Sequence, residues 1–297
     1  MNSGGSPLVT IVNACLREGD GGSPTAVLDD LPLTDEQRAS VPRLMGTSHA
    51  VFVSVGEDVP SGAGEGRVLA SLRFFTSGGE LPACGHGTVA ALAHLAARTA
   101  GREYEATLST SGRTFTGRAV RDGQQIRAVF RTGGVDLRDA TGAELDLVLA
   151  PLGLAPDTLA SDPRVASLGR ARLLVPVAAG DALTNLAPDL VRLREVCDRL
   201  GLLGCCVHTM PTGGRIAARM FAPSIGVPED IANANSAACL AAQFAGRGRT
   251  DIAVDMGDSL GAPSTITAVA ESRPTGLVVH VGGHAAISHT RRLDWNR

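Results

Sequence analysis

The chain has 297 residues, with 27 basic and 30 acidic side chains, a formal net charge of −3 and 44% hydrophobic residues. This is the composition of a globular protein and excludes a disordered chain, and no basic stripe with aromatic residues points to nucleic acid. Every basic residue is Arg, which excludes a Schiff-base lysine and the lysine of a nucleotide-binding P-loop.

The sequence carries no sign of secretion or of a membrane anchor. No segment combines a basic start with the apolar run of a signal peptide, and no apolar stretch reaches the ~18 residues of a membrane span. The six cysteines are scattered without metal-finger spacing, so we expect core thiols instead of a disulfide framework. These features predict a cytoplasmic protein.

Alternating apolar and β-branched residues predict strands throughout the chain. In the first half they span Leu8–Asn13, Ala50–Val55, Val68–Phe75, Glu105–Ser109, Gly112–Arg118 and Ile126–Arg131. In the second half they span Ala171–Val177, Cys205–Thr209, Gly214–Met220, Asp251–Asp255, Ser264–Val269, Gly276–Val281 and Ala285–Thr290. Peripheral amphipathic helices are predicted at Asp35–Met45 and Pro188–Leu200, the second opening with its Pro.

An internal repeat links the two halves of the chain. The segments Arg73–Pro82 and Arg219–Pro228 align with matching Arg, Phe and Pro residues at a constant offset of 146. Each is followed by a polar loop and then by a run of small apolar residues, Thr88–Arg98 or Asn235–Phe244. We expect both runs to be helices that are buried on all sides, with Thr88 and Asn235 as N-caps.

The repeat predicts an α/β (α+β) fold of two pseudo-symmetric halves, each a curled, mostly antiparallel sheet around one buried helix. We expect the halves to be residues 1–128 and 129–297, with the last strand, about 276–290, able to return to the first half. The loops that precede the two buried helices would then face each other across a cleft.

The loop before the first buried helix reads LPACGHGTV and carries two groups able to do chemistry, Cys84 and His86. Gly85, Gly87 and Thr88 would present backbone N–H groups at a helix N-terminus, where a carboxylate is favoured. The glycines also fit a dinucleotide fingerprint, but Pro82 interrupts the strand and the following helix is predicted to be buried. We therefore expect no nicotinamide or flavin.

The second loop supplies a further acid/base group, Asp230, which the offset of 146 places opposite Cys84. An enzyme that takes a proton from carbon and returns one elsewhere needs two such groups. Asn233 and Asn235 are candidate oxyanion donors, and the backbone near Ser236 is a second candidate carboxylate site.

The alternative readings are structural. Cys84 would be a core thiol, Asp230 a helix cap, and His49 an ordinary surface residue before a strand. The remaining histidines form no clear ligand set, and we expect no metal site.

Several ordered motifs resemble one family. The motifs are Gly22–Val27 (GSPTAV), Ser48–Val53 (SHAVFV), Glu80–His86 (ELPACGH), Phe221–Asp230 (FAPSIGVPED) and Gly261–Ser264 (GAPS). They are similar to those of the phenazine-biosynthesis isomerase-like family within the diaminopimelate-epimerase superfold. The resemblance implies two pseudo-symmetric domains, a homodimer, no cofactor, and proton-shuttle isomerisation of a small carboxylic acid.

Carried over residue by residue, the resemblance makes His86 and Asp230 active-site residues. The family's proton-shuttling Glu is replaced by His49 here, and the imidazole of His49 could act as the base in its place. Cys84 lies where related epimerases and proline racemases keep one catalytic cysteine, whereas their second cysteine is Asn233 here. One thiol without its partner argues against two-base racemisation.

The sequence thus predicts a cofactor-free isomerase that shifts a double bond in a small unsaturated or cyclic amino or imino acid, with His49 or Cys84 as the base. The altered site suggests a specialised natural-product pathway. Isomerases similar to this family that move a double bond in 4-alkyl-proline precursors of antibiotics fit the lysine-free composition. Two alternatives stay open: a racemase, epimerase or dehydratase of a proline-like acid, and a non-catalytic ligand-binding protein.

Overall fold

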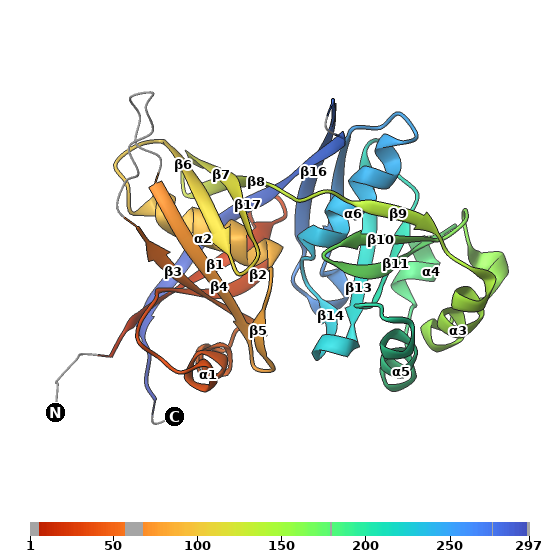
Figure 1. The fold of residues 1–297 in the computed structure, drawn as a ribbon, viewed down its shortest axis with the longest axis horizontal. Helices are drawn as coiled ribbons and strands as arrows, with labels where there is room; N and C mark the ends of the chain where they lie inside the picture. Colours follow the sequence, from red (N-terminus) through yellow and green to blue (C-terminus); the bar gives the residue numbers. More distant parts are fainter. Residues whose placement is uncertain (1–5, 57–67, 179, 275, 296–297) are drawn as a thin grey trace. The chain divides into compact units, whose positions relative to one another are not determined.

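The computed structural model describes residues 6–56, 68–178, 180–274 and 276–295. The chain divides into two compact units, and it enters the first of them twice: unit 1 comprises Met1–Arg131 with Gly282–Arg297, and unit 2 comprises Thr132–Val281 (Figure 1). Each unit is a mixed α/β structure made mostly of strands. Among the described residues, no helix is long and apolar enough to cross a membrane.

Unit 1 is a closed ring of strands. Its members are β1 (Leu8–Leu16), β2 (Ser23–Asp29), β3 (His49–Val55), β4 (Val68–Thr76), β6 (Glu103–Thr110), β7 (Arg113–Asp122), β8 (Gln125–Arg131) and the C-terminal part of β17 (Gly276–Arg292). They pair in the order β17, β1, β2, β3, β4, β6, β7, β8, and β8 pairs again with β17. The pairs β2–β3 and β4–β6 are parallel. The short β5 (Gly79–Leu81) forms a hairpin with β4.

Helix α2 (Gly85–Ala97) fills the interior of this ring. Residues 85–96 are all buried, and the helix contacts the seven strands β1 to β4 and β6 to β8. Small side chains allow this enclosure, and so does Gly117 on β7, where a Cβ would lie 2.9 Å from Leu92. The predicted burial on all sides is confirmed, but the predicted cap is wrong, because α2 begins at the N-cap Cys84 and not at Thr88.

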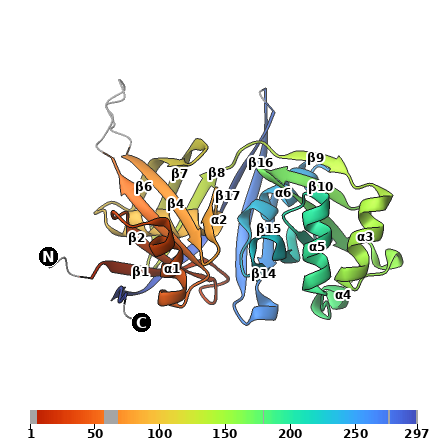
Figure 2. The same ribbon diagram turned by 60° about the horizontal axis from the view of Figure 1, so that its bottom comes forward.

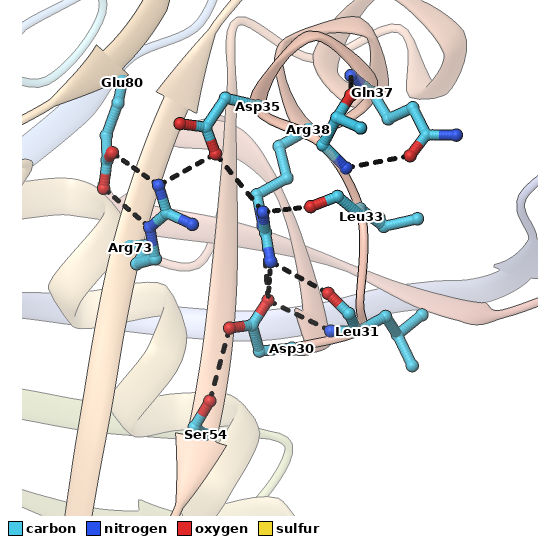
Figure 3. Close-up of polar contacts among 10 residues, drawn as sticks. Asp30, Leu31, Leu33, Asp35, Gln37, Arg38, Ser54, Arg73 and Glu80 are labelled. Carbon is cyan, nitrogen blue, oxygen red and sulfur yellow. Dashed lines mark hydrogen bonds and ion pairs between the residues drawn. The ribbon is translucent and has the colours of Figure 1, made fainter.

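Helix α1 (Asp35–Met45) packs on the outside of the ring, and a polar network holds it there. Arg38 pairs with Asp30, and Figure 3 shows Asp35 lying between the guanidinium groups of Arg38 and Arg73. Arg73 also makes a two-pronged ion pair with Glu80 on β5, at 2.9 and 2.6 Å. This network fixes the β5 hairpin immediately before the loop that enters α2.

Unit 2 repeats the same pairing pattern. Its strands are β9 (Asp136–Asp139), β10 (Arg164–Leu168), β11 (Arg170–Val177), β12 (Cys205–Thr209), β13 (Arg215–Ala222), β14 (Val227–Asp230), β15 (Asp251–Met256), β16 (Ser264–Arg273) and the first part of β17. Strands β10 to β16 alternate antiparallel and parallel partners as β1 to β7 do, with β11–β12 and β13–β15 parallel. Strand β9 pairs with β10 as the end of β17 pairs with β1.

Helix α6 (Ala234–Ala245) is the buried helix of unit 2 and packs on β10, β15 and β16. Outside the sheet lie α3 (Gly142–Leu152), α4 (Gly180–Thr184) and α5 (Leu190–Leu200), with α3 and α5 side by side (Figure 2). Short 3₁₀ turns occupy Pro156–Thr158, Pro223–Ile225 and Asp258–Leu260.

Several predicted boundaries need correction. The N-cap of α6 is Asn233 and not Asn235, and α5 is capped by Asp189, so Pro188 precedes the helix. β17 is one continuous strand where two were predicted. The sequence prediction also missed β2, β5, β9, β10, β14, α3 and α4.

Candidate active site

Three of the predicted site residues meet in unit 1 at the N-terminus of α2. His49 opens β3, Cys84 is the N-cap of α2, and His86 is the second residue of that helix. The Cys84 sulfur lies 3.4 Å from His86 Nε2, and the imidazole rings of His86 and His49 meet edge to face with centroids 4.4 Å apart. All three are buried, with 4%, 6% and 2% of His49, Cys84 and His86 exposed.

The local backbone explains how these side chains converge. Cys84 is extended, with φ −144° and ψ 115°, and within the described chain its sulfur makes no capping hydrogen bond. Its carbonyl instead accepts both the backbone N–H and the hydroxyl of Thr88, at 2.9 and 2.8 Å. Thr88 therefore locks the first turn of α2 and leaves the sulfur directed at His86.

Gly85 and Gly87 lie at the N-terminus of α2, where their N–H groups were expected. Both lie in the first turn of α2, so they do not supply an unusual backbone conformation. A Cβ at Gly87 would lie 3.0 Å from Cys84 Sγ and 3.1 Å from both Phe74 and Val51. Glycine is needed there because the cysteine sulfur and two apolar side chains occupy the space.

Burial sets the charge state of His49. Desolvation, with a smaller contribution from His86, lowers the pKa of His49 to about 2. Its Nδ1 is hydrogen-bonded to Ser48 Oγ at 2.9 Å. His49 is therefore a neutral imidazole at physiological pH.

The remaining predicted residues gather in unit 2 at the N-terminus of α6. Asn233 Oδ1 accepts the N–H of Ser236 at 2.8 Å, and Asn233 Nδ2 donates to Asp230 Oδ2 at 2.9 Å. The other oxygen of Asp230 accepts the N–H of Ala232 at 3.3 Å. Asn235 is half-buried on the first turn of α6. Asn233 and Ser236 thus have partners within the protein, and Asp230 is held as an acceptor.

Arg172, on β11, completes this cluster and was missed by the sequence-based prediction. It is 1% exposed, and its Nη1 donates to Asn233 Oδ1 at 3.0 Å and to Ser236 Oγ at 3.1 Å. Among the described residues no carboxylate pairs with it, and its buried Nε has no hydrogen-bond partner. An arginine within a strand of apolar residues is the signal that could have marked it, because buried charges are rare without a role.

The repeat relates the two clusters, with a correction to the predicted alignment. Phe74 pairs with Leu81 in unit 1 as Met220 pairs with Asp230 in unit 2. The turn from β13 to β14 contains a 3₁₀ helix and is three residues longer. The predicted pairing of Cys84 with Asp230 is therefore wrong: the two N-caps correspond, so Cys84 matches Asn233.

Two other motif residues are structural. Glu229 binds Arg219 with both oxygens, at 2.9 and 2.8 Å, as Glu80 binds Arg73 in unit 1. Ser264 is fully buried, and its hydroxyl donates to the carbonyl of Ile231 at 2.5 Å, so the last motif tethers the loop that carries Asp230.

Comparison with known proteins agrees with this architecture. Residues 13–291 match the phenazine biosynthesis-like protein family. An uncharacterized isomerase of Deinococcus radiodurans is 31% identical over 91% of this chain and 88% of its own length. A trans-2,3-dihydro-3-hydroxyanthranilate isomerase of Pseudomonas fluorescens is 30% identical over 89% of this chain and 90% of its own. The solved structure of a predicted epimerase from Pseudomonas aeruginosa superposes with a TM-score of 0.81, at 26% identity, over 97% of this chain and 99% of that one.

The two-unit fold and these relatives define an enzyme of the isomerase class. The chain belongs to the phenazine biosynthesis-like protein family.

Proposed function

We propose that this protein is a cofactor-independent isomerase that shifts a double bond by proton transfer in a small unsaturated or cyclic amino or imino acid. The observation that carries the proposal is the buried contact of 3.4 Å between Cys84 Sγ and His86 Nε2 at the start of α2. A thiol beside an imidazole can exchange a proton with it, which provides a base and an acid at one position.

In the proposed reaction the thiolate of Cys84 takes a proton from a carbon α or γ to a conjugated acid or imine. The electron pair left behind moves through the conjugated system, and a proton from His86 or Asp230 is added at its far end. The substrate gains and loses one proton, so no oxidant or reductant is required. Neutral His49 donates or accepts a hydrogen bond beside the reacting atoms.

The substrate's carboxylate would bind at the N-terminus of α2, where the first N–H groups of the helix point out of its end. Because the turn before β14 is three residues longer than its counterpart, the residue of unit 2 that corresponds to His86 is Asn235. Its side chain would supply a further hydrogen-bond donor to the carboxylate. The homodimer, the cytoplasmic location and the role in antibiotic biosynthesis are also part of this proposal.

The main alternative is racemisation or epimerisation at one carbon. That reaction uses two bases on opposite faces, and in related racemases both are cysteines. Asn233 stands at the position equivalent to Cys84, and its amide is engaged by Arg172 and Asp230. This disfavours a two-thiol mechanism. The thiol of Cys84 and the imidazole of His86 are close enough to exchange a proton, and this disfavours a non-catalytic binding protein.

Proton NMR in D₂O tests the proposed function. Purified protein is incubated with a panel of cyclic unsaturated amino and imino acids, with a Cys84→Ala, His86→Ala double variant as the control. We expect deuterium to enter a new carbon together with a shifted double bond. Deuterium confined to the α-carbon with unchanged connectivity would indicate the racemase instead, and binding without exchange would favour the non-catalytic alternative.

A further inference from the structure

The cluster at the start of α2 has the donor set of a transition-metal site. His49, Cys84 and His86 each offer one ligand atom, and the three atoms lie within 4.8 Å of one another. In a tetrahedral zinc site, Zn–S bonds of about 2.3 Å and Zn–N bonds of about 2.0–2.1 Å place sulfur and nitrogen roughly 3.5 Å apart. The Cys84 Sγ to His86 Nε2 distance is 3.4 Å.

A hydrogen bond between thiol and imidazole would give a similar distance, so this distance alone does not distinguish a metal site from a hydrogen-bonded pair. The position of the third side chain, His49, makes the distinction. His49 is not needed for such a bond, yet it is buried against His86 at 4.4 Å between ring centroids. Its Nδ1 is hydrogen-bonded to Ser48 Oγ, which leaves Nε2 as the nitrogen able to bind a metal. Metal-binding histidines commonly have their second ring nitrogen fixed in this way.

The types of donor atom suit the same role. Metal ligands bind in their deprotonated forms, which here are one thiolate and two neutral imidazoles. One thiolate and two imidazoles form a set that Zn²⁺ prefers, whereas Mg²⁺ and Ca²⁺ require oxygen ligands.

We propose that His49, Cys84 and His86 form a three-ligand site for Zn²⁺, with the fourth coordination position open to water or to an acid group. On binding, the thiol of Cys84 releases its proton to the solvent, and the sulfur and two imidazole nitrogens donate their lone pairs to the ion. The consequence for activity depends on the proposed function: a metal-bound thiolate and imidazole no longer transfer protons, so zinc inhibits the isomerase.

Metal binding is tested directly on the full chain. Protein freed of metal by a chelator is titrated with Zn²⁺ against a chromophoric competitor, and separately with Co²⁺, whose thiolate-to-metal absorption reports sulfur ligation. We expect one ion per chain, and loss of the thiolate-to-cobalt band in Cys84→Ser. Ser48→Ala, which removes only the hydrogen bond to His49, should weaken zinc binding about 10-fold. Circular dichroism checks that each variant is folded.

Two matched controls lie outside the cluster. His94 is a buried histidine of the same helix, and Cys239 is a buried cysteine of α6. His94→Gln and Cys239→Ser should keep the stoichiometry and affinity of the parent protein. A failure to bind zinc, or a thiolate-to-cobalt band that persists in Cys84→Ser, would overturn the inference.

Activity assays in chelator separate this inference from the proposed function. Active metal-free protein that zinc inhibits supports both. Active protein that binds no zinc overturns only the metal site. If metal-free protein is inactive and zinc restores turnover, the site is confirmed and cofactor independence is wrong.

Discussion

Arg172 Nη1 lies 3.0 Å from Asn233 Oδ1, and the amide nitrogen of the same Asn233 donates to Asp230 at 2.9 Å. Because the guanidinium can only donate, it fixes which end of the amide faces it. The nitrogen end is thereby directed at Asp230. A buried cation without a carboxylate partner in the described chain thus determines how the carboxylate of Asp230 is held.

We predict that Arg172→Met lowers kcat/KM by about 10- to 100-fold. This factor corresponds to the free energy that one hydrogen bond to a charged group contributes. The melting temperature should not fall comparably, because removing a buried unpaired charge offsets the lost contacts. Asn233→Ala should give a similar loss, and the double variant should show less than the sum of the two effects. A pH–rate profile that does not move in either variant would contradict a positioning role.

The base can be identified by comparing His49 with Cys84. A base whose conjugate acid has a pKa of about 2 accepts protons poorly near neutrality. We therefore expect Cys84→Ser to lose about 10²-fold or more in kcat, and His49→Gln to lose less while its pH–rate profile keeps the same limbs. A larger loss in His49→Gln would make the imidazole the base.

His86 and Asp230 are each expected to act as a general acid or base. His86→Ala and Asp230→Ala should each cost on the order of 10² to 10⁴ in kcat. His94→Gln, in the same helix as His86, is the control and should retain turnover. Wild-type turnover in both alanine variants, measured by deuterium incorporation, would refute the assignment.

Gly87 tests the packing around the thiol. An alanine Cβ there would lie 3.0 Å from Cys84 Sγ, so Gly87→Ala should displace the sulfur, destabilise the protein by about 1–3 kcal/mol and reduce activity. Gly142, the first residue of α3, has space for a Cβ, because apart from its chain neighbours and the adjacent backbone of its own helix no atom of the described chain lies within 4 Å of that position. Gly142→Ala should leave activity unchanged and stabilise by at most about 1 kcal/mol. Equal behaviour of the two variants in thermal unfolding and in turnover would contradict this steric account.

Acid sensitivity should depend in part on His208. Burial lowers its pKa to about 4, so between pH 6.5 and 4 the unfolded chain binds the proton more readily. Above pH 6.5 His208 does not reduce the free energy of unfolding. As the pH falls towards 4 the free energy of unfolding decreases, by about 2 kcal/mol between pH 7.5 and 5. Denaturant unfolding at these two pH values should show a smaller loss for His208→Asn than for the parent protein. The exposed His289→Asn should match the parent; identical losses in all three proteins would refute the prediction.

The sequence by itself determined the repeat, the two buried helices and the presence of Cys84, His86 and Asp230 in the loops before them. These follow from local chemistry: small apolar residues make a helix that can be enclosed, and Arg and Glu recur around the hairpins. The same local patterns failed to predict β2, because Gly22 and Pro24 lie on either side of its first residue and are typical of turns. In the structure β2 nevertheless pairs with both β1 and β3.

Only the tertiary structure decided which residues meet. His49 is 35 residues from Cys84 in the chain, and it reaches the thiol and His86 because β3 lines the ring that encloses α2. The three-residue longer turn before β14 changed the match of Cys84 from Asp230 to Asn233, a shift that a constant offset could not reveal. The role of Arg172 likewise depends on a strand and a helix that are 61 residues apart in sequence. Side-chain convergence of this kind is set by strand pairing and burial, which no local pattern records.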